Sequence, residues 1–391
     1  MPKPVIVSAV RTAIATSFKG SLVNTTPEFL ATSILQEAVR RSGVEVADID
    51  DVIFAESHYG GGDMARYAAS ASGMTSVPGQ AVNRHCAGSL TAVGNAAAQI
   101  SSGMEKVVVG GGVQSLSMTP LMNWRIPGPT LEFEERWIPP THVETPDAPG
   151  RDMSITVGWN TAQAVGISRE EMDAWAYRSH QRAVGAIDGG KFVDEILPLK
   201  IKGREDALIE FAVDEHPRRE TSPEKLASLK VLHPEIEGFS ITAGNSSGTN
   251  DAAAALTLAD DGYASAHGLK VLGTVRAWAA AAVEPKDTGL GAVKVIGKVL
   301  DRAGLAPGDV ALWEINEAFA SVPIAACREY GLDEERVNFF GSGCSLGHPI
   351  AASGARMLTT LVHELGRRGG GIGVAAMCAG GGQGGAVVIE V

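Results

Sequence analysis

The sequence has few cysteines, few aromatic side chains and no long uninterrupted hydrophobic run. Four of its 391 residues are cysteine and 5% are aromatic. Four cysteines could form two disulfides, but residues 5–7 form a strand-like run where a signal peptide would have its apolar region. We therefore expect free thiols in a reducing, cytoplasmic compartment. No apolar run approaches the length of a membrane span, so we expect no membrane partner.

Basic charge is also scarce. The 33 Lys and Arg residues are outnumbered by 45 Asp and Glu residues, which gives a net charge of −12. This balance argues against nucleic acid or an anionic membrane as the main partner. It still allows a small anionic ligand, because one local basic patch is enough to bind it. The length allows two or three domains with a large core.

Glycine is abundant, and two of the 47 glycines reveal an internal repeat. Residues 38–50 and 299–311 have the same pattern: the end of a helix, a glycine C-cap at Gly43 or Gly304, then a turn and a strand. Similar matches follow in the same order along both halves, and one of them aligns Cys86 with His348. Chance could explain any one match, but the shared order favours a duplication.

Short apolar runs separated by helix-length segments predict an α/β fold, in which helices cover a parallel or mixed sheet. The duplicated halves do not fill the chain, because residues 117–250 have no counterpart. We expect three parts: an N-terminal half formed by residues 1–116 and 251–270, a C-terminal half formed by residues 271–391, and an insertion at 117–250 that covers an active site.

Cys86 precedes a predicted helix. Apolar residues at helical spacing follow it, and Gly103 ends the run. A thiol at a helix N-terminus is near unpaired N–H groups and the positive end of the helix dipole, which favour a thiolate. A lone cysteine can equally be a small buried hydrophobe. His348 occupies the equivalent position in the second half, where an imidazole beside a thiol would be an activating pair.

Cys378 follows a predicted strand at residues 372–377 and precedes three glycines. Such a turn exposes backbone N–H groups that can form an oxyanion hole. It does not match a dinucleotide or phosphate-binding loop, because no lysine follows and no helix opens after the glycines at the required spacing. His85, beside Cys86, lacks further ligands at metal-binding spacing, so we expect no metal.

Four motifs resemble those of the thiolases, enzymes that use coenzyme A thioesters. They are NEAFA at residues 316–320, GHPI at 347–350, CAGG at 378–381 and TAGNSSG at 242–248. The resemblance spans almost the whole chain. It implies a layered αβαβα core built from duplicated halves, with a loop domain inserted over the active site. It also implies coenzyme A as a co-substrate and no permanently bound cofactor.

The resemblance assigns roles to five residues. Cys86 is the nucleophile that carries the acyl group, and His348 activates it. His348 and a water held by Asn316 form one oxyanion hole, and the N–H groups of Cys86 and Gly380 form another. Cys378 is the acid and base for the α-carbon and the leaving thiol.

The same resemblance implies binding residues and partners. Ser247, Ala243 and Phe319 line a pantetheine channel, and Arg218 meets the nucleotide end of coenzyme A. The substrates are acyl-CoA and CoA, and the protein assembles as a homodimer or homotetramer.

Two segments depart from the family pattern. Residues 86–89 read CAGS where the family usually has Cys-x-Ser-Gly, and residues 153–160 replace the stretch that covers the acyl pocket in relatives. The acyl group is therefore not predicted. We expect Cys327 in the core and Cys344 in a packing role.

The predicted function is acyl transfer between a 3-oxoacyl-CoA and CoA, in fatty-acid breakdown by β-oxidation or in the reverse Claisen condensation. One alternative is a ketoacyl synthase-like condensing enzyme, which typically uses two histidines or a histidine and an asparagine with its cysteine. The other is a non-catalytic carrier of acyl-CoA or lipid with the same fold.

Overall fold

The computed structural model describes residues 2–59, 62–136, 140–203 and 207–391. Most of its strands join one mixed sheet, whose main members are β1 (Pro4–Thr12), β3 (Asp51–Glu56), β4 (Gly79–Val82), β5 (Val107–Gln114), β11 (Asn250–Asp260), β12 (Gly273–Ala282), β13 (Leu312–Ile315), β14 (Ile372–Ala379) and β15 (Gln383–Glu390). Their order in space is β13-β14-β15-β12-β1-β11-β5-β3-β4, so the strands of the two chain halves stay on separate sides.

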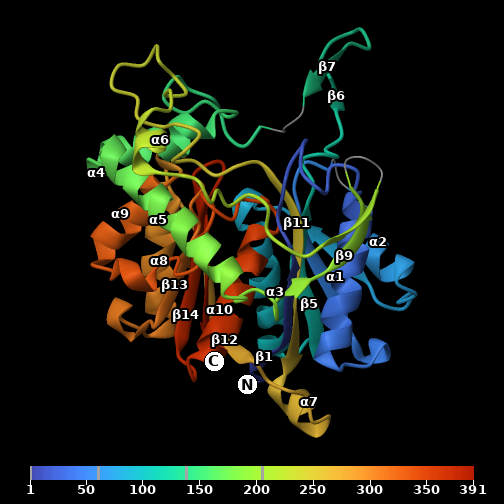
Figure 1. The fold of residues 1–391 in the computed structure, drawn as a ribbon. Coiled ribbons are helices and arrows are strands. Elements are labelled where there is room, and N and C mark those ends of the chain that lie inside the picture. The colour runs from blue at the N-terminus through green and yellow to red at the C-terminus, as the bar shows by residue number, and fades with distance from the viewer. Residues whose placement is uncertain (1, 60–61, 137–139, 204–206) are drawn as a thin grey trace.

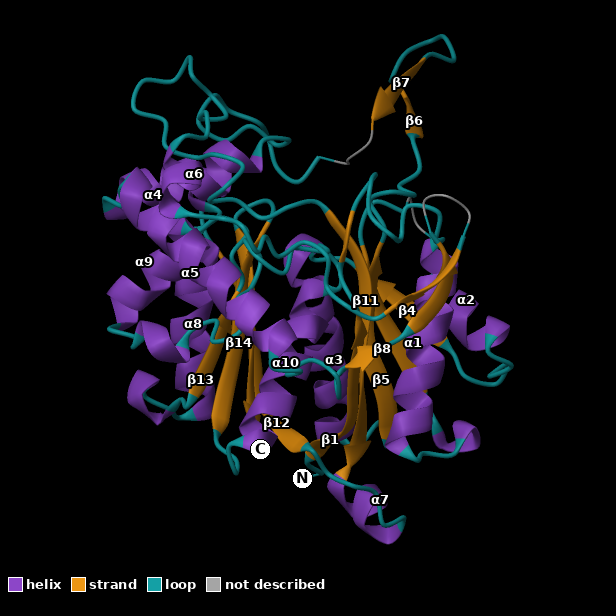
Figure 2. Cartoon of the chain, viewed as in Figure 1, coloured by secondary structure: helices purple, strands orange, loops and turns teal. Residues whose placement is uncertain are grey.

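A short antiparallel pairing joins the two sides, in which Val5 and Ile6 of β1 lie opposite Thr274 and Gly273 of β12. Two helices, α3 (Gly88–Ser102) and α10 (Ser353–Arg367), lie between them (Figure 2). Each contacts strands of both sides: α3 packs on β5 and β12, and α10 on β14 and β11.

Further helices cover the outer faces (Figure 1). They are α1 (Pro27–Ser42) and α2 (Met64–Ala71) on the N-terminal side, and α8 (Leu290–Ala303) and α9 (Ser321–Tyr330) on the C-terminal side. The layered αβαβα prediction is confirmed.

The repeated pattern has the predicted local structure in both halves. The α1 helix starts at an N-cap, Thr26, whose side chain accepts a hydrogen bond from the Phe29 N–H, and it ends at Gly43 with φ 70°. The α8 helix ends at Gly304 with φ 67°. A side chain would be strained at such positive φ values, which explains glycine at both C-caps. A 3₁₀ turn follows in each half, at Val46–Asp48 and Pro307–Asp309, before β3 or β13 begins.

Part of the segment 117–250 projects beyond one end of the sheet, and part runs down alongside it (Figure 1). Its described elements are the hairpin of β6 (Met122–Arg125) and β7 (Phe133–Arg136), a π-helical turn (Ser154–Trp159), α4 (Asn160–Val165), α5 (Arg169–Asp188), β8 (Ile196–Leu197), β9 (Leu199–Lys202), β10 (Leu208–Phe211) and α6 (Pro223–Ala227). A buried cluster anchors the segment, because Arg11 of β1 forms ion pairs of 2.7 Å with both Glu195 and Asp214.

The smaller elements β2 (Ala15–Thr16) and α7 (Asp261–Ala266) complete the fold. Cys327 and Cys344 are buried in the hydrophobic cluster of the C-terminal side, which agrees with core and packing roles. All four cysteines are free thiols. No helix in the described ranges is long and apolar enough to cross a membrane.

Candidate active site

The predicted reactive residues converge at the ends of four elements. Cys86 lies in a short 3₁₀ turn (His85–Ala87) before α3, and His348 lies in the loop before α10. Cys378 is near the end of β14, and Asn316 directly follows β13. Cys86, Cys378 and His348 line one cavity of about 200 Å³. The other residues that line it are Leu116, Met153, Val157, Ser247, Gly248, Thr249, Ala318, Phe319, Ile350, Ala379 and Gly380.

Cys86 lies where the sequence predicts, but its thiol keeps its proton in the resting site. Its turn leads into α3, which ends at Gly103 as expected. Burial raises the pKa of the Cys86 thiol to about 11, although the backbone N–H groups of Gly380 and Cys86 lower it. The N–H groups therefore favour the thiolate as the sequence predicts, but they do not outweigh burial in the resting site. Desolvation outweighs the N–H groups, so the proton must be removed by a base.

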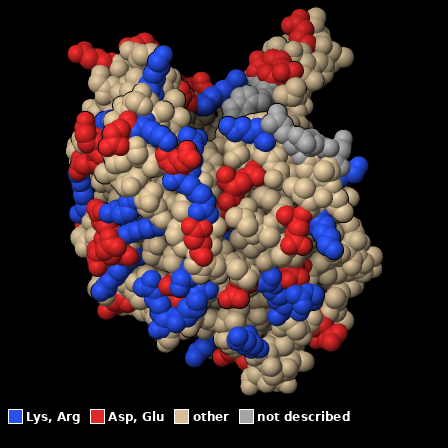
Figure 3. All heavy atoms as spheres, viewed as in Figure 1, with Lys and Arg blue, Asp and Glu red and all other residues tan. Residues whose placement is uncertain are grey.

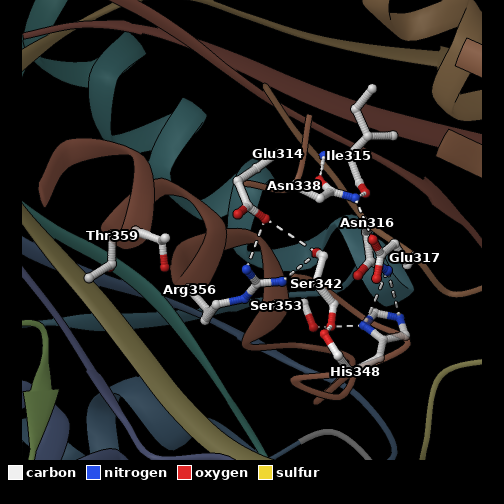
Figure 4. Close-up of polar contacts among 12 residues, drawn as sticks. Glu314, Ile315, Asn316, Glu317, Asn338, Ser342, His348, Ser353, Arg356 and Thr359 are labelled. Atoms are coloured by element: carbon white, nitrogen blue, oxygen red, sulfur yellow. Dashed lines mark hydrogen bonds and ion pairs between the residues drawn. The ribbon is translucent and has the colours of Figure 1, made fainter. Parts of the chain in front are cut away.

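The imidazole of His348 is oriented by a hydrogen bond to Ser353. Its Nδ1 lies 2.7 Å from the Ser353 hydroxyl oxygen, and that hydroxyl donates to the Pro349 carbonyl at 2.9 Å (Figure 4). When that hydroxyl gives its proton to the Pro349 carbonyl, Nδ1 carries its own proton and donates it to Ser353. Nε2 is then the basic nitrogen. Burial, aided by the charge of Arg356, lowers the pKa of His348 to about 3, so the ring is neutral.

Asn250 fixes the backbone of His348. Its side-chain oxygen accepts the His348 N–H at 2.9 Å, and its amide nitrogen donates to the Ala15 carbonyl at 3.0 Å. A side chain at Gly347 would collide with this amide at 2.5 Å, and Gly347 has φ 103°. Glycine in the Gly-His-Pro motif is therefore required by close packing as well as by backbone conformation.

Asn316 lies against the imidazole. Its amide nitrogen is 3.4 Å from both ring nitrogens of His348, so it contacts the ring without a single well-defined hydrogen bond (Figure 4). Its side-chain oxygen is buried and has no hydrogen-bond partner among the described residues. A buried polar atom of this kind is suited to a small polar ligand such as a water molecule.

Cys378 is the second thiol of the cavity. Burial raises its pKa well above the ordinary range, and the neighbouring Cys86 adds to the effect. The strand continues into a turn in which Gly381 and Gly382 have φ values of 79° and 74°. A side chain at Gly381 would approach the Thr141 carbonyl to 2.9 Å, so the bare backbone is needed here.

Two of the four predicted binding residues lie in the cavity, and two lie outside it. Ser247 and Phe319 line the cavity, and the Ser247 N–H donates to the Ala318 carbonyl at 2.9 Å. Ala243 and Arg218 are exposed and do not contribute to this lining. The Arg218 N–H instead donates to Nδ1 of His180 at 3.1 Å.

Sequence reasoning missed the apolar lining and the residues that position His348. Met153 and Val157 belong to the segment recognised only as a departure from the family pattern. Ser353 lies three residues after the GHPI motif, and a serine at this position does not by itself indicate a contact with the imidazole. No group of three His, Cys, Asp or Glu residues in the described part of the chain is arranged to hold a metal ion.

Known proteins are similar to this chain over almost its whole length. Residues 4–262 match the family model "Thiolase, N-terminal domain", and residues 269–391 match "Thiolase, C-terminal domain". The chain is 37% identical to a 3-ketoacyl-CoA thiolase of Bacillus subtilis (strain 168), with 100% of both chains covered. It is 38% identical to an acetyl-CoA acetyltransferase of Pseudomonas aeruginosa, over 100% of this chain and 99% of the other.

A solved structure extends the similarity to the fold. The acetyl-CoA acetyltransferase of Bacillus anthracis superimposes with a TM-score of 0.92 at 40% identity, covering 100% of this chain and 99% of that one.

Proposed function

This chain belongs to the thiolase family, and from that premise we propose that it transfers an acyl group between a 3-oxoacyl-CoA and CoA through a thioester on Cys86. The observation that carries the proposal is the cavity shared by Cys86, His348 and Cys378, in which Ser353 lies 2.7 Å from Nδ1 of His348 and leaves Nε2 for proton transfer. A nucleophile, its base and a second acid–base group are the parts that this chemistry needs.

In the cleavage direction, Nε2 of His348 takes the proton of the Cys86 thiol. The thiolate attacks the C3 carbonyl carbon of the substrate, and collapse of the adduct breaks the C2–C3 bond. The acyl group stays on Cys86, and the acetyl-CoA enolate takes a proton from Cys378. CoA then gives its thiol proton to the Cys378 thiolate and attacks the acyl-cysteine. Cys86 leaves as a thiolate and recovers its proton from His348.

Two sets of donors stabilise the negative oxygens that form in these steps. The N–H groups of Cys86 and Gly380 form one set, supported by their effect on the Cys86 thiol. His348 and a water held by the unpartnered oxygen of Asn316 form the other. Each such donor typically lowers the barrier by roughly 3 kcal/mol.

Coenzyme A enters as a co-substrate along the Ser247 and Phe319 side of the cavity. Ala243 and Arg218 extend this path towards the nucleotide end. Lys and Arg side chains gather between the two projecting lobes of the molecule in Figure 3, where they suit an anionic ligand. Assembly as a homodimer or homotetramer and a cytoplasmic location stay predictions.

Intact-protein mass spectrometry after incubation with a panel of acyl-CoAs tests the proposal. The protein is expected to gain the mass of the acyl group, and peptide mapping is expected to place it on Cys86. Cys86→Ala should abolish the adduct, whereas Cys327→Ala, which removes a core thiol outside the cavity, should keep it. Tight acyl-CoA binding by the unaltered protein without any adduct would instead support a carrier.

A further inference from the structure

A buried ion pair lies behind His348 and Asn316. Glu314 is in β13, two positions before Asn316, and Arg356 is in α10, one helical turn after Ser353. Nη1 of Arg356 donates to Oε2 of Glu314 at 2.9 Å (Figure 4). The pair therefore links the strand that ends at Asn316 to the helix whose first residue contacts the His348 ring.

Ser342 joins this pair from a third segment. Nη2 of Arg356 donates to the Ser342 hydroxyl oxygen at 2.9 Å, and that hydroxyl donates to Oε2 of Glu314 at 3.2 Å. The adjacent Gly343 packs directly on Asn316, because a side chain there would lie 3.0 Å from the Asn316 oxygen. The strand, the loop and the helix around the imidazole thus share one charged centre.

Stability alone does not explain this ion pair. The Glu314 and Arg356 side chains are 0% and 1% exposed. Oε1 of Glu314 and Nε of Arg356 have no hydrogen-bond partner among the described residues. Desolvating two charges is costly, and apolar replacements of buried pairs are often neutral or stabilising. A pair with unpartnered atoms therefore suggests a role in the adjacent site.

The charge of Arg356 opposes the proton transfer on which the proposed function rests. Arg356 is the charged group that acts on His348, while the neighbouring Asn316 and Ser353 are uncharged. When His348 takes the proton of Cys86, a second cation forms close to Arg356. The Cys86 thiolate formed in the same step attracts that cation, but only an anion beside Arg356 cancels the repulsion from Arg356 itself.

We propose that Glu314 is a positioning residue that neutralises Arg356, so that His348 can accept the proton of Cys86. The inference rests on the proposed function of His348 as a base. The charged groups acting on Glu314 are Arg356, which lowers its pKa, and Glu317, which raises it. Burial is the largest cause and brings the pKa of Glu314 to about 7, so its charge develops near neutral pH.

Alkylation of Cys86 by iodoacetamide provides a test that needs no acyl-CoA. The Cys86 thiolate displaces iodide, and the rate at fixed pH reports how readily the thiol loses its proton. At pH 8, Glu314→Gln is expected to slow alkylation at least about tenfold, which corresponds to one unit in the pKa of the thiol–imidazole pair. The double variant Glu314→Gln/Arg356→Met should recover to within about threefold of the unaltered protein, because it removes the uncompensated cation.

A purely structural role predicts the opposite order, since the double variant loses more hydrogen bonds than the single one. The inference is overturned if Glu314→Gln reacts at the unaltered rate, or if the double variant is slower than Glu314→Gln. If Glu314→Gln is insoluble, Glu314→Asp replaces it in the test, because aspartate keeps the charge. Its rate of Cys86 alkylation must then agree with that of the double variant to within about threefold, again on the scale of one pKa unit. A larger gap overturns the inference.

The control is Glu195→Gln, which removes a buried carboxylate from the Arg11 ion pair outside the cavity and should leave the alkylation rate unchanged. Acylation measured on the same samples separates the two proposals. Normal alkylation of the unaltered protein without acyl transfer would contradict the proposed function, while the comparison between Glu314 variants would still decide this inference.

Discussion

At the scale of single residues, the proposed mechanism needs the hydroxyl of Ser353 to hold the Nδ1 proton, so that Nε2 of His348 is the basic nitrogen. Ser353→Ala removes the acceptor of the Nδ1 proton, so the ring can turn or change tautomer. We expect kcat to fall about tenfold to hundredfold, less than the roughly hundredfold to ten-thousandfold that a general base itself contributes, because only its orientation is lost. KM should change little, because Ser353 is not among the cavity-lining residues. Steady-state cleavage of a 3-oxoacyl-CoA measures both constants.

The matched control for this prediction is Ser353→Thr. It keeps a hydroxyl at the same backbone position and should retain most of the activity if the added methyl group fits. Equal kcat values for the unaltered enzyme and Ser353→Ala, with unchanged thermal unfolding, would contradict the tautomer argument.

The positions of Cys86, His348 and Cys378 could be predicted from motifs, but their protonation states could not. A cysteine at a helix start predicts a thiolate only while the site is solvated. In the folded chain burial raises the pKa of Cys86 to about 11. Burial depends on segments distant in sequence, such as the one that contributes Met153 to the cavity. The role of Ser353 could likewise not be predicted from the sequence, because it depends on a tertiary contact with the imidazole.

At the scale of secondary-structure elements, the π-helical turn Ser154–Trp159 shapes one side of the cavity, where we propose that the acyl group lies. It places Val157 in the lining, beside Met153. Truncating Met153 to alanine would create apolar space, and each buried methylene is worth about 0.8 kcal/mol, or roughly fourfold in an equilibrium constant. We expect Met153→Ala to raise kcat/KM for a substrate two methylenes longer by about tenfold relative to the shortest substrate.

Competition between 3-oxoacyl-CoAs of different length measures this ratio directly. Met172→Ala, which removes a buried methionine of α5 outside the cavity, should lower stability but leave the ratio unchanged. An identical chain-length profile for Met153→Ala and the unaltered enzyme would remove Met153 as a determinant of the acyl group.

Elements with local signals were predicted well, and the π-helical turn was not. The glycines that end α1 and α8, and the end of α3 at Gly103, follow from residues near each helix end. In the π-helical turn, a side chain at Gly158 would lie only 2.9 Å from the Phe319 ring, and the Gly158 carbonyl accepts the Ser321 hydroxyl at 3.0 Å. Partners so distant in sequence leave no periodic pattern in the turn itself.

At the scale of the whole molecule, the internal repeat predicted two similar halves, and the family resemblance implied the layered core. Neither predicted that β1 and β12 would join both sides through a short pairing. That junction depends on how the two sides pack around α3 and α10, which contact strands from both. The active site lies at this contact, because α3 follows Cys86 and α10 follows His348. Stability of the packed halves is therefore a condition for the site.

Buried neutral histidines make that stability sensitive to acid. His180 is 3% exposed, and its Nδ1 accepts the Arg218 N–H, which requires an unprotonated nitrogen. Burial lowers its pKa from 6.5 to about 4, assisted by the charges of His216 and Arg218. The unfolded chain takes up the proton first as pH falls. The contribution to stability is therefore complete above pH 6.5 and is lost progressively towards pH 4.

A comparison with His180→Gln isolates this effect from other titrating groups, among them Glu314, whose raised pKa acts in the opposite direction. Glutamine keeps an acceptor but does not titrate. Between pH 7 and pH 4.5, the unaltered protein is expected to lose about 2 kcal/mol more stability than His180→Gln. Urea unfolding at the two pH values measures the difference, and the exposed His267→Gln should behave like the unaltered chain. Equal losses for the unaltered protein and His180→Gln would mean that His180 is not held neutral by burial.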